Sequence, residues 1–390
     1  MLPKNFFCAS TSCGIRKGLD LSLIWSNDVC CSAAVFTKNA FKAAPVKVCQ
    51  QLLIENNAHG VVINAGNANA VTGAKGYKDA LKMSNALSKP LFVLSTGVIG
   101  KPLPIDKIMT GIKVNNNQLA SNESSVSTLA KSIMTTDTKP KYITKTIQLE
   151  TGAIGTITGI AKGAGMIHPN MATMLGCVLT DCKVPSQNYL QTLLNKTSAT
   201  TFNTISVDGD TSTNDTLLAM SNNQFEMSQN DLKEFEISFT AICDYLSTEI
   251  VKDGEGATKL ITLHVSGLST NESALNVARF VSTSPLVKTA IFGRDANWGR
   301  LFSSAGSSPE LMDTTFESTE GMTCSFMSSA GEIKVFNGTP LDFDEDLGRK
   351  ILSEDSIAIH LHLNQGNGSA KVKFCDFSPE YVNVNASYRS

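Results

Sequence analysis

Short apolar runs alternate with longer amphipathic stretches along the chain, and this pattern predicts mixed α/β structure. The runs Val61-Val62-Ile63, Leu91–Leu94 and Leu260–Val265 are too short for helices and are bounded by Gly, Asn or Ser, so each predicts a strand. Turn residues between further apolar runs predict two hairpins, one turning at Asn337-Gly338 and the other at 364–368.

Helical periodicity is clearest over 231–251, where apolar residues recur at spacings of three and four. Asp231 and Glu234 predict a capping box at the start of this helix, and Ser269 and Glu272 predict another before a helix over 274–281. Turn signals are spread evenly, which favours one compact mixed fold with its best internal boundary between Gly163 and Leu175. Weaker helical patterns cover 76–88, 122–134 and 186–198.

Composition narrows the class of protein. The chain has 390 residues, of which 42% are hydrophobic and 17% are charged. There are enough hydrophobic residues to form a large core, and long disordered tracts are not expected. A net charge of −2 is not typical of a nucleic-acid binder, and no apolar run approaches the roughly 18 residues that span a bilayer. Without a signal-peptide pattern, the ten cysteines are expected to be free thiols in the cytoplasm.

Several common motifs are absent from the sequence, among them the phosphate-binding GxxxxGK[ST] loop, GxGxxG, HExxH and the GxSxG elbow. His360 and His362 would share one face of a strand, but a zinc site needs at least three protein ligands and no third is apparent. We therefore expect no metal site.

The segment 162–175 has a different character. Glycines and Pro169 shape the backbone before Ala172-Thr173, where a hydroxyl directly follows a small residue. Attack of Thr173 Oγ on the preceding carbonyl, an N→O acyl shift and hydrolysis would free a Thr whose own α-amine can act as general base. The alternative interpretation is a turn leading into a buried helix, with Thr173 in its first turn.

The same segment, KGAGMIHPNMATMLGCVLTD, resembles the cleavage and nucleophile motif of the ornithine acetyltransferase family, also called glutamate N-acetyltransferase. The resemblance continues nearly end to end, with the family's blocks in the same order. The other matching blocks are FTKNAFKAAPV (36–46), VINAGNANAVTG (62–73), STGVIG (95–100), IMTTDTKPK (133–141), FNTISVDGDTSTNDT (202–216), VKDGEGATK (251–259), FGRDANWGR (292–300) and CDFSPEYVNVNASYRS (375–390).

The resemblance implies a layered αββα architecture, shared with related self-processing aminopeptidases, and a role for each matching residue. Thr173 matches the nucleophile, Ala172-Thr173 the self-cleaved bond, and Thr96 and Gly97 the pair that stabilises the oxyanion. The matching substrate-binding positions are Thr135 (with neighbouring Thr136 as the alternative), Lys162, Thr173, Glu255, Asn385 and Ser390, where the family usually ends in Thr. Asn64, Asn67 and Asn69 are expected to support the site through backbone hydrogen bonds, whereas Asp208, Asp215, Arg294, Trp298 and Arg300 are interpreted as structural.

The resemblance also implies the reaction. N-acetylornithine would acetylate Thr173, and glutamate would then accept the acetyl group, with ping-pong kinetics and no metal or organic cofactor; some family members also use acetyl-CoA. Self-cleavage would give an α chain, 1–172, and a β chain, 173–390, which together form one compact fold and assemble as a heterotetramer of two α and two β chains. Two rivals remain: a self-processing amidohydrolase or aminopeptidase that uses water as acceptor, and a metabolite-binding protein whose Thr173 never cleaves.

Overall fold

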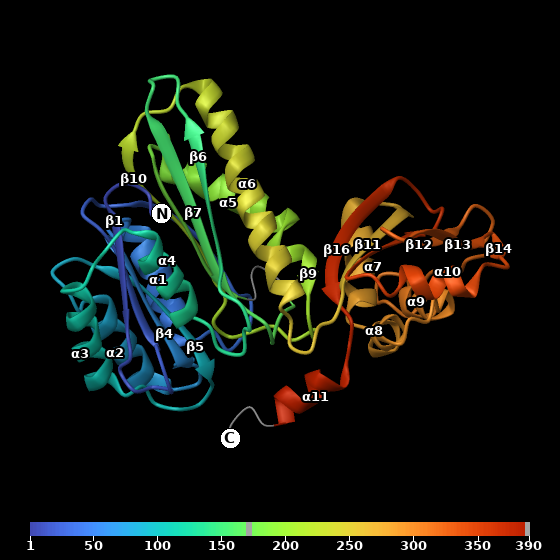
Figure 1. The fold of residues 1–390 in the computed structure, drawn as a ribbon, viewed down its shortest axis with the longest axis horizontal. Coiled ribbons are helices and arrows are strands. Elements are labelled where there is room, and N and C mark those ends of the chain that lie inside the picture. The colour runs from blue at the N-terminus through green and yellow to red at the C-terminus, as the bar shows by residue number, and fades with distance from the viewer. Residues whose placement is uncertain (169–173, 387–390) are drawn as a thin grey trace. The chain divides into compact units, whose positions relative to one another are not determined.

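Three β-sheets and the helices that cover them organise the residues described by the computed structural model, 1–168 and 174–386 (Figure 1). The chain divides into two units: unit 1 contains 1–203 and 210–250, and unit 2 contains 204–209 and 251–390. The segment 163–175, which the sequence suggested as an internal boundary, lies inside unit 1.

The first sheet of unit 1 runs in the order β1-β2-β4-β5, and its strands are buried on both faces. Alternate residues of β4 point to opposite faces, so that Val61 and Ile63 join one hydrophobic cluster while Val62 joins another. The strands are β1 Phe6–Thr11, β2 Leu21–Ser26, β4 Gly60–Asn67 and β5 Leu91–Val98.

The second sheet of unit 1 runs in the order β3-β10-β8-β7-β6. Cys177 and Leu179 of β8 and Leu218 of β10 share a buried cluster with Val61 and Ile63, so the two sheets pack face to face. The strands are β3 Cys31–Phe36, β6 Lys141–Gln148, β7 Ile154–Lys162, β8 Leu175–Cys182 and β10 Thr216–Phe225.

Helices cover the outer faces of both sheets. Ile108 and Ile112 of α3 and Met83 of α2 pack on the first sheet, and a side chain at Gly159 of β7 would collide with Ile242 of α6. Unit 1 therefore has the αββα layering that the resemblance implied. Its helices are α1 Ala44–Glu55, α2 Gly73–Ser84, α3 Ile105–Asn116, α4 Glu123–Ser132, α5 Gln187–Thr200 and α6 Gln229–Lys252, with a short 3-10 turn at Phe202–Thr204.

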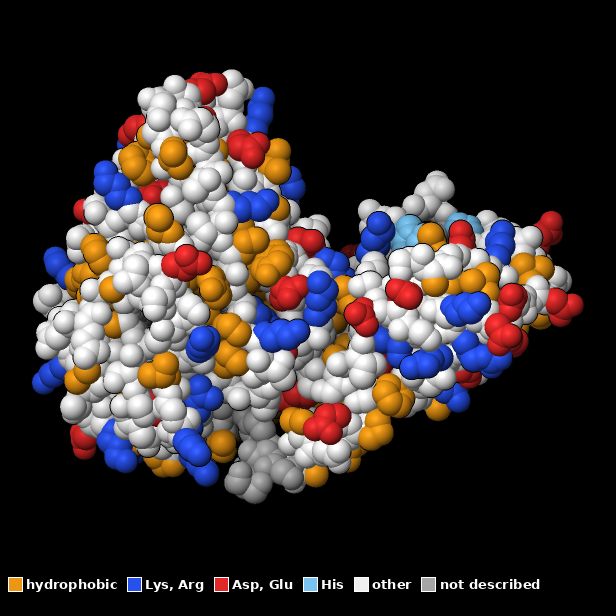
Figure 2. Space-filling model, in the orientation of Figure 1, with side chains coloured by type: hydrophobic (Ala, Val, Ile, Leu, Met, Phe, Trp, Pro, Cys, Tyr) orange, Lys and Arg blue, Asp and Glu red, His pale blue; other side chains and the backbone are white. Residues whose placement is uncertain are grey.

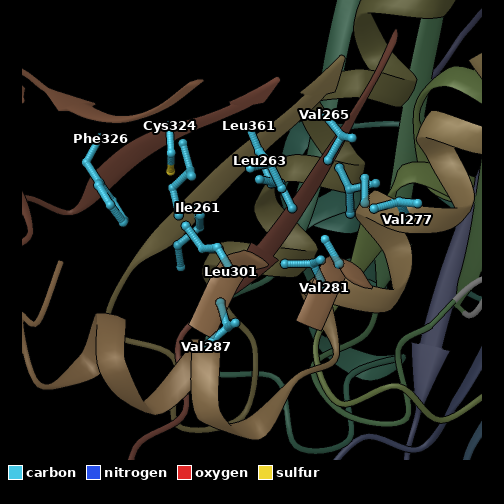
Figure 3. Close-up of a cluster of buried hydrophobic side chains, with 14 of the residues drawn as sticks. Ile261, Leu263, Val265, Val277, Val281, Val287, Leu301, Cys324, Phe326 and Leu361 are labelled. Carbon is cyan, nitrogen blue, oxygen red and sulfur yellow. The ribbon is translucent and has the colours of Figure 1, made fainter. Parts of the chain in front are cut away.

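Unit 2 is built on a seven-stranded sheet in the order β14-β13-β12-β15-β11-β16-β9. One face carries the core, in which Ile261, Leu263 and Val265 of β11 pack against Val277 and Val281 of α7 (Figure 3). The elements are β9 Ile205–Ser206, β11 Leu260–Leu268, α7 Asn271–Ser282, α8 Pro285–Phe292, α9 Trp298–Gly306, β12 Thr323–Ser328, β13 Gly331–Asn337, β14 Thr339–Pro340, α10 Glu345–Ile351, β15 Ser356–His362, β16 Gly368–Cys375 and α11 Pro379–Ala386.

The other face of this sheet is polar. His264 and His360, on neighbouring strands, contact each other edge to face at 5.4 Å between ring centroids, and Ser266 pairs with His362. Histidine side chains are visible at the surface of unit 2 in the space-filling view (Figure 2). Among the described residues, no group of three or more His, Cys, Asp or Glu has an arrangement that could hold a metal ion.

One predicted hairpin is confirmed and the other is wrong. Asn337 pairs with Thr339 across Gly338, whose φ of +73° supplies the tight turn. Segments β15 and β16 are strands, but β11 lies between them, parallel to β15 and antiparallel to β16. The Asn- and Gly-rich connection shows that the chain turns there, whereas strand pairing is decided by packing with a strand distant in sequence.

The predicted helices are confirmed, but their caps differ from the predicted ones. Ser228 and Asp231 exchange side-chain to backbone hydrogen bonds at the start of α6, so Asp231 occupies the third helical position and not the cap. Thr270, not Ser269, caps α7 by accepting a bond from Ser273 N. Several Ser, Thr and Asp residues lie within one turn of the start of each helix, and the residue that caps the helix is the one directly before its first turn.

Candidate active site

Lys162 is the centre of a buried polar cluster in unit 1. It ends β7, is 7% exposed, and donates from Nζ to Thr135 Oγ1 at 2.8 Å and to Thr96 Oγ1 at 3.4 Å. Three of the sequence-predicted site residues therefore meet at one ammonium group. Because both hydroxyls accept from Lys162, each keeps its own O–H proton to donate to a further group. Thr135 is the threonine of the pair 135–136 that makes this contact.

Asp137 holds the cluster together, and sequence reasoning missed it. Its side chain is fully buried and accepts from Thr135 N at 3.0 Å, Gly163 N at 2.7 Å and Lys141 Nζ at 2.7 Å, while Lys162 Nζ lies 3.8 Å away. Burial alone would raise the pKa of this carboxyl, but the charges of Lys162 and Lys141 hold it well below its usual range. Asp137 is therefore an anion that fixes both the Thr135 loop and the turn after Lys162.

Asp215 is a second buried acid near Lys162, and it has a different character. It is 2% exposed, and its Oδ2 has no hydrogen-bond partner among the described residues. Burial raises its pKa well above the usual value, and the charge of Lys162 offsets that only in part. The interpretation of Asp215 as structural is neither confirmed nor contradicted by this environment.

The Thr96-Gly97 pair lies at the end of β5, opposite an irregularity in β4 at Gly66-Asn67. Gly97 has φ +127°, and a Cβ there would lie 2.3 Å from Gly66 C and 2.5 Å from Asn67 N. A side chain at position 97 would force the backbone of β4 to move, so the close approach of the two strands explains the glycine.

The Asn-rich segment formed by the end of β4 and the residues just after it supports this strand end through backbone hydrogen bonds, as the sequence predicted. Asn64 donates to Asn67 O, Asn67 to the carbonyls of Lys101 and Pro102, and Asn69 to Gly76 O. All three asparagines are buried. Their amides therefore tie the end of β4 to the segment after β5 and to the first turn of α2.

Glu255 and Asn385 meet in unit 2. Glu255 is 9% exposed and lies in the loop after α6, and Asn385 of α11 donates from Nδ2 to its Oε2 at 2.8 Å. Ser378 donates to Gly256 O, and at Gly256 a Cβ would lie 2.4 Å from Tyr381 N. The expected docking of the C-terminal segment is thus confirmed as far as residue 386.

The remaining predicted residues, Ala172, Thr173 and Ser390, lie outside the described residues. His168, the last described residue before Ala172 and Thr173 in the sequence, accepts through its carbonyl from Thr211 Oγ1 at 2.9 Å. The ten cysteines are free, and burial raises the pKa of Cys49 and of Cys177 to about 12, so neither is a thiolate nucleophile at neutral pH. No helix in the described part of the chain has the length and apolar character needed to cross a membrane.

Comparison with known proteins shows which family and which individual proteins this chain is similar to. The ArgJ family model matches residues 7–390. The chain is 41% identical to the mitochondrial arginine biosynthesis bifunctional protein ArgJ of Aspergillus clavatus, with 100% of this chain and 92% of that protein covered. It is also 41% identical to the arginine biosynthesis bifunctional protein ArgJ of Lactococcus lactis, with 100% and 98% covered. A solved structure of ornithine acetyltransferase from Mycobacterium tuberculosis, complexed with ornithine, is 34% identical, with 44% of this chain and 94% of that chain covered and a TM-score of 0.40.

Proposed function

Because the chain belongs to the ArgJ family, we propose that it transfers the acetyl group of N-acetylornithine to glutamate through an acetyl ester on Thr173. The observation that supports this most is the buried cluster of Thr96, Thr135 and Lys162, with its charge balanced by Asp137. A buried ammonium that orients two hydroxyls suits a site where a negative charge develops on a carbonyl oxygen.

In the first half-reaction, Thr173 Oγ attacks the acetyl carbonyl carbon and its proton passes to the free α-amine of Thr173. The oxyanion that forms accepts hydrogen bonds from the Thr96 hydroxyl and from backbone N–H groups at Gly97. When the tetrahedral intermediate collapses, the C–N bond breaks, the proton moves to the departing amine, and ornithine leaves. Oxyanion donors of this kind contribute about 2.7–4 kcal/mol each to transition-state stabilisation.

In the second half-reaction, the α-amine of glutamate attacks the ester carbonyl, and N-acetylglutamate leaves as Thr173 Oγ recovers its proton. Lys162 would bind a substrate carboxylate as a compact positive charge, with Thr135 beside it. Glu255, oriented by Asn385, would pair with a substrate amine, and Ser390 would add a hydroxyl contact. This assignment includes no metal or organic cofactor, and acetyl-CoA as an additional acetyl donor stays a prediction.

Self-cleavage at Ala172-Thr173 is part of the proposal, and strand pairing in the sheet of unit 1 supports it, because this pairing would hold the two fragments together. Strand β7 of the α chain, 1–172, pairs with β8 of the β chain, 173–390, over six residue pairs. Strand β3 of the α chain likewise pairs with β10 of the β chain. We further propose that two α and two β chains assemble as a heterotetramer and that the protein is located in the cytoplasm. The name of the Aspergillus clavatus relative describes that protein as mitochondrial.

Intact mass under denaturing conditions tests the nucleophile. We expect two fragments that meet at Ala172-Thr173 in the wild type and a single full-length chain in Thr173→Ala. Parallel double-reciprocal plots for N-acetylornithine and glutamate are expected from a covalent intermediate. Intersecting lines would contradict the ping-pong scheme, and release of acetate without transfer to glutamate would favour the hydrolase.

A further inference from the structure

A pocket of about 450 Å³ lies where α1 and α2 begin in unit 1. Its lining includes three lysines, Lys42, Lys47 and Lys78, and two aromatic residues, Phe41 and Tyr77. None of these residues belongs to the cluster around Lys162. The volume is within the roughly 300–1,000 Å³ that is typical of small-molecule sites.

The pocket is positively charged and its charge is not balanced locally. No acidic residue lines it, and the three lysine side chains make no ion pair or hydrogen bond with any of the residues the structure describes. Lys75, which lies close by on α2, differs because it pairs with Asp79 at 2.6 Å. Three uncompensated ammonium groups around one cavity favour an anionic ligand.

Backbone donors add to this charge. Both α1 and α2 begin without a side-chain cap, and the Thr72 hydroxyl at the start of α2 donates instead to Asn69 Oδ1 at 2.7 Å. Ala44 and Gly73, the first residues of the two helices, line the pocket. At α1 the N–H of Ala44 donates to Asn69 O at 3.2 Å and Pro45 has no N–H, so it is the first turn of α2 that offers backbone N–H groups to phosphate oxygens beside the lysines.

The two aromatic side chains of the lining favour a nucleotide over a simple anion as the ligand. Phe41 is 70% exposed, an unusual state for a phenylalanine, and its ring lies on the lining of a cationic cavity. Tyr77 is held by a 2.6 Å hydrogen bond from its hydroxyl to Gln51. A flat base can stack on such a ring while its phosphates contact the lysines.

From these observations we propose that this pocket is a second ligand site, separate from the acetyl-transfer site, and that it binds a nucleoside diphosphate or a ligand containing one. The phosphates contact Lys42, Lys47 and Lys78, and the base stacks on Phe41. The proposal does not depend on the acetyl-transfer chemistry and predicts binding in the absence of either amino-acid substrate.

Isothermal titration of the full protein with ADP tests this site directly. We expect saturable ADP binding that weakens as salt is raised. Lys47→Glu/Lys78→Glu is expected to weaken ADP binding at least about 100-fold, because two attractive charges become repulsive. Phe41→Ala is expected to weaken ADP binding about tenfold and to leave pyrophosphate binding unchanged.

Lys107→Glu/Lys113→Glu, at two exposed positions of α3 outside the pocket, is the control with the same change of charge and is expected to bind ADP as the wild type does. All variants change exposed or half-exposed side chains, and equal unfolding midpoints would verify that they fold. Absence of ADP binding at millimolar concentration, or binding that Lys47→Glu/Lys78→Glu leaves intact, would overturn the proposal. Because titration heat reports binding and not turnover, neither result bears on the acetyl-transfer reaction.

Discussion

Replacement of Asp137 by Asn tests whether this buried anion holds the Lys162 cluster in place. Asn has nearly the same shape and can still accept from a backbone N–H, but it carries no charge. Lys141 and Lys162, with side chains 2% and 9% exposed, would lose their common counter-charge. Removing one partner of a buried ion pair costs about 3–5 kcal/mol, so we expect the unfolding free energy to fall by about that amount at pH 7.

The pair Lys75–Asp79 provides a matched control, because it has the same spacing of four residues but an exposed lysine. Lys75 is 62% exposed, so water solvates its ammonium when Asp79 becomes Asn. We expect Asp79→Asn to lower the unfolding free energy by about 1 kcal/mol or less. The difference between the two variants isolates the effect of burying the cation.

The assay is urea unfolding followed by tryptophan fluorescence. The chain has two tryptophans, Trp25 in unit 1 and Trp298 in unit 2, so a Trp298→Phe background makes the signal report unit 1. A fall of less than about 1 kcal/mol for Asp137→Asn would refute the reasoning, since an uncompensated buried charge should cost several times more.

Acidification supplies a second readout with a defined sign. The pKa of folded Asp137 lies well below its ordinary value, so the unfolded chain binds the proton first. Its stabilising contribution is complete above the ordinary pKa of about 4 and is lost as the pH falls towards the folded value. The stability gap between wild type and Asp137→Asn should therefore narrow below pH of about 4, and a constant gap would contradict the assignment.

Three further substitutions, two of them paired with a control variant, test other parts of the account. Gly97→Ala should lower the unfolding free energy by more than about 2 kcal/mol, because the new Cβ would collide with the backbone of β4. Gly100→Ala, also at positive φ but with open space around it, should lower the unfolding free energy by about 1 kcal/mol. Urea unfolding measures both variants. Lys162→Met should lower kcat/KM about 100-fold in the acetyl-transfer assay, because a charged hydrogen-bond donor is lost, and an unchanged value would remove Lys162 from substrate binding. Asn385→Ala should raise KM about 5–10-fold, whereas Asn383→Ala, which removes an exposed bond to a glutamate on the same helix, should leave KM unchanged in initial-rate measurements.

Local patterns were sufficient for the strands and helices that the sequence analysis names, but not for the pairing of the strands. The buried runs around Val61 and Leu91 predict strands because periodicity and flanking turn residues are properties of a few neighbouring positions. The insertion of β11 between β15 and β16 depends on contacts between residues about 100 positions apart, and no turn signal encodes it. The division into two units could not be predicted from local patterns either, because α6 continues across the boundary at residue 250.

The candidate site shows the same difference between what local sequence reveals and what contacts between distant residues determine. Thr96, Thr135 and Lys162 were chosen by resemblance to a family, and the fold brings these three together in one unit. Asp137 was missed although it lies in the block 133–141, because an acid between threonines and lysines is usually a solvated surface residue. The available signal was its spacing of four residues from Lys141, and its importance became visible only when β7 brought Lys162 beside it.

Trapping the acetyl-enzyme is the most direct test of the central claim. The purified protein would be mixed with N-acetylornithine carrying an isotopically labelled acetyl group, quenched in acid and digested for peptide mass analysis. We expect one labelled acetyl group on the peptide that begins at Thr173, lost again when glutamate is added before the quench. Transfer of label to glutamate with no label on that peptide at any time point would contradict the acetyl-Thr173 intermediate.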